Sequence, residues 1–76
     1  MSINVKIILA DDHPIVRQGL RQVIEREPDF IISAECSNGR EVLTTLETQP
    51  ADVLILDVDM PLMNGFEVLS RLQQIN

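Results

Sequence analysis

Short apolar runs alternate along this chain with segments whose apolar residues recur at helical spacing. The apolar runs are rich in β-branched residues and predict strands at residues 5–10, 30–36 and 53–57. The amphipathic segments predict helices at about residues 14–27, at about 40–48, and after the loop 62–65. Because strand and helix patterns alternate three times, the sequence predicts an α/β fold of order βαβαβα, with a parallel sheet and right-handed crossovers.

The first predicted helix is bounded by two prolines. Pro14 suits the first helical turn, and Pro28 ends the helix at about Glu27. Glycine costs about 1 kcal/mol relative to alanine inside a helix, so Gly19 on the inner stripe predicts a close approach of the helix to the sheet. The stripe expected to face the sheet is Ile15, Val16, Gly19, Leu20, Val23 and Ile24.

The other two helices have narrower apolar stripes. These stripes are Val42, Leu43 and Leu46 in the second helix, and Phe66, Val68, Leu69, Leu72 and Ile75 in the third. With 76 residues and almost no aromatic side chains, the chain forms one small domain at most, with a core of Ile, Val and Leu.

Carboxylates follow two of the predicted strands. Asp11 and Asp12 end the first strand, while Asp57 ends the third, a run that we expect to be buried on both faces; Asp59 comes two residues later. Parallel strands point the same way, so these four acids should meet at one edge of the sheet if the two strands are neighbours. Crowded carboxylates favour a hard cation such as Mg²⁺, and an aspartate beside that ion can act as a nucleophile toward a phosphoryl group.

The charge of the chain limits the possible functions. The formal net charge is −6, and the six Lys and Arg residues are scattered, which argues against nucleic-acid binding by this segment. One cysteine, Cys36, excludes an internal disulfide framework, and we expect a small buried hydrophobic residue there. No apolar run is long enough to span a membrane, and no signal peptide is evident, so the expected compartment is the cytoplasm.

These motifs together resemble the receiver domains of two-component response regulators. The resemblance rests on Asp11-Asp12, on Asp57, and on Met60-Pro61 followed by Gly65; the run from Ala10 to Leu20 further resembles the NarL/FixJ subfamily. It implies a flavodoxin-like (CheY-like) doubly wound parallel sheet with Asp57 as the phosphoacceptor. It also implies a Mg²⁺ site made by Asp11, Asp12, Asp57 and the backbone carbonyl of Asp59, with a sensor histidine kinase as phosphoryl donor and no enzymatic turnover beyond self-phosphorylation and possible autophosphatase activity.

The chain departs from this family in length. Receiver domains have five βα units, whereas residues 1–76 supply three, so we expect a partial receiver domain truncated to βαβαβα. Within residues 1–76 we therefore expect neither the hydroxyl residue of the fourth strand nor the lysine of the fifth, and we expect the output domain to be absent. The resemblance implies that DNA binding, which this subfamily performs through a helix-turn-helix module, belongs to that output domain.

The truncation has a structural consequence. In the receiver strand order, the third strand becomes an open apolar edge, and edges of that kind pair with other chains. Phe66, Leu69 and Leu72 should also be partly uncovered. We therefore expect a homodimer or an exchanged assembly through the open third-strand edge, or a complex with the missing part of the domain.

Two other interpretations remain open. Asp57 and Asp59 also resemble the nucleophile and general acid of haloacid-dehalogenase-like Mg²⁺-dependent phosphatases, although that family places its motif on the first strand. The second alternative is an interaction module that keeps the fold but acts without phosphorylation. The side chain of Asp59 can point into the site or to water. We expect His13 to be an entry residue of the first helix, and Met60 and Met63 to make packing or loop contacts.

Overall fold

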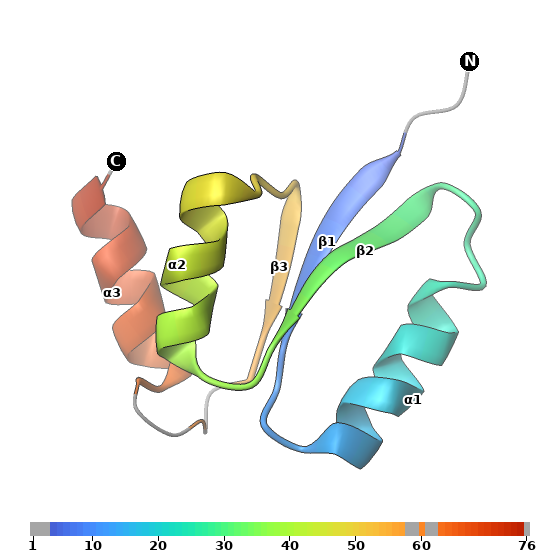
Figure 1. Cartoon of the computed structure of the whole chain (residues 1–76), viewed down its shortest axis with the longest axis horizontal. Helices are drawn as coiled ribbons and strands as arrows, with labels where there is room; N and C mark the ends of the chain where they lie inside the picture. Colours follow the sequence, from blue (N-terminus) through green and yellow to red (C-terminus); the bar gives the residue numbers. More distant parts are fainter. Residues whose placement is uncertain (1–3, 58–59, 61–62, 76) are drawn as a thin grey trace.

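In the computed structural model, three parallel strands alternate with three helices (Figure 1). The structure describes residues 4–57, 60 and 63–75. The elements are β1 (Val5–Ala10), α1 (Pro14–Ile24), β2 (Phe30–Cys36), α2 (Gly39–Thr48), β3 (Val53–Leu56) and α3 (Gly65–Ile75). Each predicted strand and helix is present, so the predicted βαβαβα order is confirmed.

The sheet has the order β2-β1-β3, with β1 in the centre. Both pairings are parallel, and Ala10 at the end of β1 lies opposite Cys36 on one side and Leu56 on the other. Only the central strand is enclosed: Ile7, Ile8, Leu9 and Ala10 are all buried. The prediction that the third strand is buried on both faces is wrong, because β3 is an edge strand in which Val53 is exposed and its neighbours are half-buried.

An irregularity in β2 changes which side chains face which helix. Ile7 pairs with Ile32 but Ile8 pairs with Ala34, which leaves Ser33 as an extra residue. Because side chains alternate between the faces of a strand, one extra residue reverses the alternation beyond it. Cys36 consequently joins the core on the α2 side of the sheet, and Glu35 faces α1.

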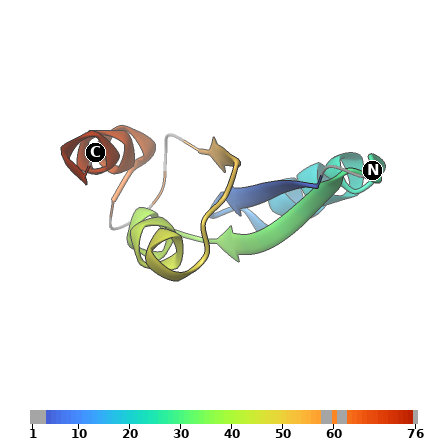
Figure 2. The same ribbon diagram turned by 90° about the horizontal axis from the view of Figure 1, so that it is seen from above.

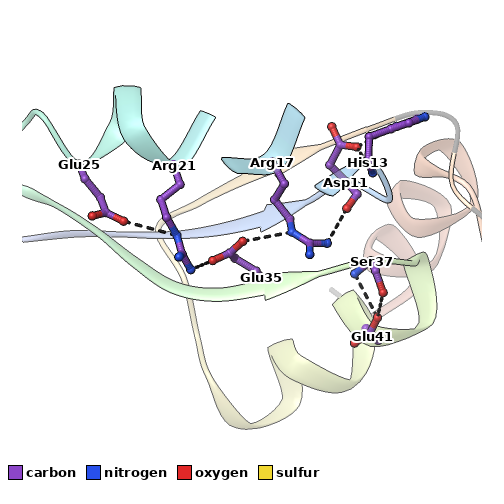
Figure 3. A network of polar contacts seen from close by, with 8 residues as sticks. All are labelled: Asp11, His13, Arg17, Arg21, Glu25, Glu35, Ser37 and Glu41. Atoms are coloured by element: carbon purple, nitrogen blue, oxygen red, sulfur yellow. Dashed lines mark hydrogen bonds and ion pairs between the residues drawn. The ribbon is translucent and has the colours of Figure 1, made fainter. Parts of the chain in front are cut away.

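Helix α1 lies on the opposite face of the sheet from α2 and packs against β2 (Figure 3). Its last residue is Ile24, and hydrogen-bonded turns rather than helix continue to Glu27. The predicted inner stripe is partly wrong: Ile24 is buried and Leu20 half-buried, but Ile15, Val16 and Val23 are exposed. The reason is that the flank carrying Arg17 faces β2.

Gly19 does not mark a close approach to the sheet, which corrects the prediction from sequence. It is exposed, and a Cβ added there would meet no atom of the described residues within 4 Å. Helical spacing identified the apolar side of α1 correctly, but it cannot specify which part of that side another element covers.

The main core lies between the sheet, α2 and α3. Val42 and Val68 are fully buried in it, and Leu43, Leu46 and Leu72 are partly buried against it. Figure 2 shows α3 beside α2, beyond the edge strand β3. Phe66 and Leu69 are exposed, as predicted for the third helix. Among the described residues, no helix combines the length and apolar character needed to cross a membrane.

Candidate functional site

Backbone pairing at the ends of β1 and β3 brings the predicted acidic residues together. The Asp57 amide donates to the Ala10 carbonyl at 2.9 Å, and the Asp11 amide donates to the Cys36 carbonyl at 3.0 Å. Each residue therefore continues its strand by one further hydrogen bond. This geometry confirms that the first and third strands are neighbours with their carboxyl ends at the same edge of the sheet.

Four side chains form a compact cluster at this edge, namely Asp11, Asp12, His13 and Asp57. One ligand atom from each lies within 4.8 Å of the others. The Asp11 side chain is only 9% exposed, whereas those of Asp12 and Asp57 are 29% and 27% exposed. Asp11 therefore lies at the buried end of the cluster, and Asp12 and Asp57 lie at the end that is open to solvent.

His13, which the sequence predicts only as an entry residue of the first helix, also belongs to this cluster. It is the N-cap of α1, and its Nδ1 atom lies 3.1 Å from Asp11 Oδ1, 3.0 Å from Asp12 Oδ1 and 3.7 Å from Asp57 Oδ2. The hydrogen bond to Asp11 and the charge of Asp12 raise the pKa of His13 above its ordinary value. The imidazolium form therefore partly neutralises the three carboxylates.

A local turn places His13 there. Its backbone N–H donates to Asp11 Oδ1 at 2.8 Å, which is the bond of an Asx turn. An aspartate two residues before a histidine, at the predicted start of a helix, is the sequence signal that could have revealed this contact. The same turn fixes the Asp11 carboxylate at the buried end of the cluster.

The donor set fits a magnesium ion. Asp12 Oδ1 is buried and accepts no hydrogen bond of good geometry from the described residues, although His13 Nδ1 is close to it. Oxygen ligands of Mg²⁺ lie at roughly 2.1 Å, so they are separated from one another by about 3 to 4 Å. The ligand atoms of the cluster lie within 4.8 Å of one another, and Asp11, Asp12 and Asp57 supply the carboxylate oxygens that such an ion takes.

The remaining predicted residues divide into three groups. Asp59, with its predicted carbonyl ligand, lies outside the described residues. Met60 is buried in the core and Met63 packs against it, which confirms their predicted packing role. Cys36 is a buried thiol, as predicted; burial raises its pKa, although its contact with Thr45 acts in the opposite direction.

Comparison with known proteins identifies the family of this chain. The family model described as the response regulator receiver domain matches residues 7–76. The nitrate/nitrite response regulator protein NarL of Escherichia coli (strain K12) is 41% identical over 68 residues, which are 90% of this chain and 32% of that protein. This chain therefore spans about a third of the length of that curated relative.

Solved structures agree with the sequence matches. The signal receiver domain of the response regulator NarL from Mycobacterium tuberculosis superposes with a TM-score of 0.91 at 26% identity, covering 96% of this chain and 59% of that one. RcsB from Salmonella enterica serovar Typhimurium gives 0.86 at 29% identity, covering 95% and 61%. These matches do not support the haloacid-dehalogenase alternative. With its acidic residues gathered at the ends of β1 and β3, this chain belongs to the receiver domains of two-component response regulators.

Proposed function

We propose that this chain accepts a phosphoryl group on Asp57, with Mg²⁺ held by Asp11, Asp12 and Asp57 itself. The observation that carries the proposal is the convergence of these three carboxylates, from the ends of two neighbouring strands, into one cluster. The backbone carbonyl of Asp59 is proposed as a further ligand from the family resemblance alone.

The residues of the cluster have distinct chemical roles in this proposal. An Asp57 oxygen forms the new bond to phosphorus while the bond between phosphorus and the donor atom breaks. Asp11, fixed by the His13 amide and by its own bond to β2, helps to hold the ion in place. When bound, Mg²⁺ neutralises charge on the phosphoryl oxygens during transfer. The result is an acyl phosphate on the protein rather than a released product.

Mass spectrometry tests this function directly. The full chain is incubated with Mg²⁺ and a small acyl phosphate donor, followed by intact-mass measurement and borohydride trapping. We expect one added phosphoryl group, located on Asp57. Asp57→Asn should take up none, because an amide is neither the required nucleophile nor an anionic ligand.

Asp52→Asn is a matched control for that experiment. Asp52 precedes the same strand at its opposite end, where it accepts a hydrogen bond from the Lys6 amide. The control should therefore be phosphorylated like the unmodified chain. Phosphoryl uptake by Asp57→Asn would refute the assignment, and rapid release of phosphate without a trapped adduct would favour a phosphatase.

Three further proposals follow from the resemblance to NarL-type regulators. The phosphoryl donor is a sensor histidine kinase, the protein acts in the cytoplasm, and the signal passes to a DNA-binding output domain outside residues 1–76. The RcsB structure matched above is bound to a promoter in the presence of the phosphomimetic BeF₃⁻, which supports a link between phosphorylation and DNA in a relative. In this arrangement the chain is a regulated acceptor rather than a turnover enzyme.

We also propose that this chain associates with a second copy of itself along β3. The two edges of the sheet differ: β2 carries an extra residue at Ser33 and a charge at Glu35, whereas β3 has neither a bulge nor a charge between Val53 and Leu56. Natural sheets use such features to block pairing between chains. Beside β3 lies an apolar hollow of about 410 Å³, lined by Leu54, Leu56, Gly65, Phe66, Leu69 and Leu72.

A further inference from the structure

Arg17 connects the acidic cluster to the neighbouring edge of the sheet. Its Nη1 atom donates to the backbone carbonyl of Asp11 at 2.9 Å, and its Nε atom lies 3.1 Å from Glu35 Oε1 (Figure 3). Both side chains are largely covered, with exposed fractions of 24% for Arg17 and 21% for Glu35. An ion pair this enclosed holds its geometry better than one at the open surface.

The network continues away from the site. Arg21 forms an ion pair with the other oxygen of Glu35, and its Nε atom lies 3.5 Å from Glu25 (Figure 3). Glu35 can reach α1 only because the extra residue at Ser33 reverses the alternation of side chains along β2. The extra residue in the middle of β2 therefore allows Glu35 to pair with Arg17, and Arg17 in turn contacts Asp11 at the carboxyl end of β1.

We infer that Arg17 is a positioning residue of the acidic cluster, and that Glu35 holds Arg17 in place. The carbonyl of Asp11 belongs to the peptide that joins Asp11 to Asp12, so the guanidinium fixes the plane of that peptide. The Asp11 amide is already bonded to Cys36 on the other side. Because both the amide and the carbonyl of Asp11 are hydrogen-bonded, the backbone holds the carboxylates of Asp11 and Asp12 in one orientation. This inference rests on the proposed Mg²⁺ site.

Positioning and simple electrostatics predict opposite effects when the charge of Arg17 is removed. Losing a positive charge near the cluster should strengthen cation binding if charge alone matters. Losing the anchor of the Asp11–Asp12 peptide should weaken cation binding, because the ligands then sample several orientations. Residues that orient metal ligands typically change affinity by about 10- to 100-fold when they are altered.

The test is a Mg²⁺ titration of the full chain by calorimetry. For Arg17→Met we expect a dissociation constant roughly tenfold higher than for the unmodified chain. Arg26→Met is the matched control, because it removes the same charge from the exposed turn after α1, and neither ion pair of Glu35 among the described residues involves Arg26. The control should bind Mg²⁺ as tightly as the unmodified chain or slightly more tightly. Equal or tighter binding by Arg17→Met would overturn the inference.

A second variant and a metal-free measurement keep the test decisive. Arg17→Lys retains the charge but replaces the planar fork with a single ammonium group, and it should bind Mg²⁺ several-fold more weakly. If Arg17→Met does not fold, unchanged affinity in Arg17→Lys overturns the inference. Without metal, hydrogen exchange at the His13 amide, which donates to Asp11, should accelerate in the variants that fold.

The two proposals can fail separately. Absence of Mg²⁺ binding by the unmodified chain would refute the proposed metal site. The inference about Arg17 would then be judged by exchange at the His13 amide in Arg17→Lys, and an unchanged exchange rate would overturn it.

Discussion

The Cα of Gly39 faces the backbone of Met63 so closely that a Cβ at residue 39 would lie 2.1 Å from the Met63 oxygen. Gly39 is the first residue of α2, and Met63 lies just before α3. Met63, in the segment between β3 and α3, is thus packed directly on the start of α2. No side chain other than hydrogen fits at residue 39 while this contact is kept.

We predict that Gly39→Ala destabilises the protein by about 1–3 kcal/mol, the usual cost of overpacking a closed contact. The neighbour is a backbone atom, so a change of rotamer cannot relieve the clash. Urea unfolding followed by circular dichroism measures the free energy of unfolding. Stability equal to that of the unmodified chain would show that this loop moves away without cost.

Gly19→Ala is the matched control and should change stability in the opposite direction. Gly19 lies inside α1 and is exposed, with open space at the position of its missing Cβ among the described residues. Alanine there lowers the conformational entropy of the unfolded chain, which stabilises the protein by roughly 0.5–1 kcal/mol. Loss of stability in this variant would indicate a packing contact for Gly19 that the described residues do not provide.

The contrast between these two glycines shows which features the sequence could predict. Parallel strands end at the same edge of a sheet, and β1 and β3 are neighbours, so the expectation that Asp11, Asp12 and Asp57 meet at one edge is confirmed. The sequence around a helical glycine does not indicate which residues of other elements lie near it. For that reason the predicted close approach of Gly19 to the sheet is wrong. The docking of a helix depends on its partners, which local periodicity does not specify.

The polar contacts of α1 show the same limit. Arg17 falls on the outward side of the helical pattern, but in the structure it lies against Glu35 of β2. That pairing depends on the extra residue in β2, which the local sequence pattern does not indicate. The contact of His13 differs, because it arises from a local turn that the aspartate two residues earlier could have indicated.

We predict that His13 titrates above its ordinary pKa of about 6.5 in the metal-free protein and that Mg²⁺ lowers this pKa. The raised pKa arises from the hydrogen bond to Asp11 and from the charge of Asp12. Its contribution to stability is therefore complete below the unfolded-state pKa and is lost as the pH rises through the folded-state pKa. A cation at the same carboxylates competes with the imidazolium, so Mg²⁺ affinity should rise over the same pH range.

Nuclear magnetic resonance of the imidazole, recorded against pH with and without Mg²⁺, measures both effects. His13→Gln is the control and should remove most of the pH dependence of Mg²⁺ binding near neutrality. A pKa at or below about 6.5 without metal, or one that does not respond to Mg²⁺, would contradict the prediction.

The last prediction concerns association through β3. If the apolar hollow beside β3 is part of the interface, a charge placed in it should separate the copies, because burying an unpaired carboxylate is costly. Leu69 lines the hollow and is 50% exposed, so Leu69→Asp should be tolerated in the folded chain. Ile15→Asp is the matched control, since Ile15 is 84% exposed on α1, on the other side of the sheet.

Light scattering across a dilution series in the micromolar range tests this association. The unmodified chain and Ile15→Asp should show a mass that falls on dilution, whereas Leu69→Asp should remain a monomer at every concentration. A mass that changes with concentration in all three proteins would place the interface away from the hollow. A compact monomer with cooperative unfolding at every concentration, for the unmodified chain, would show that the open edge of β3 does not bind a second copy.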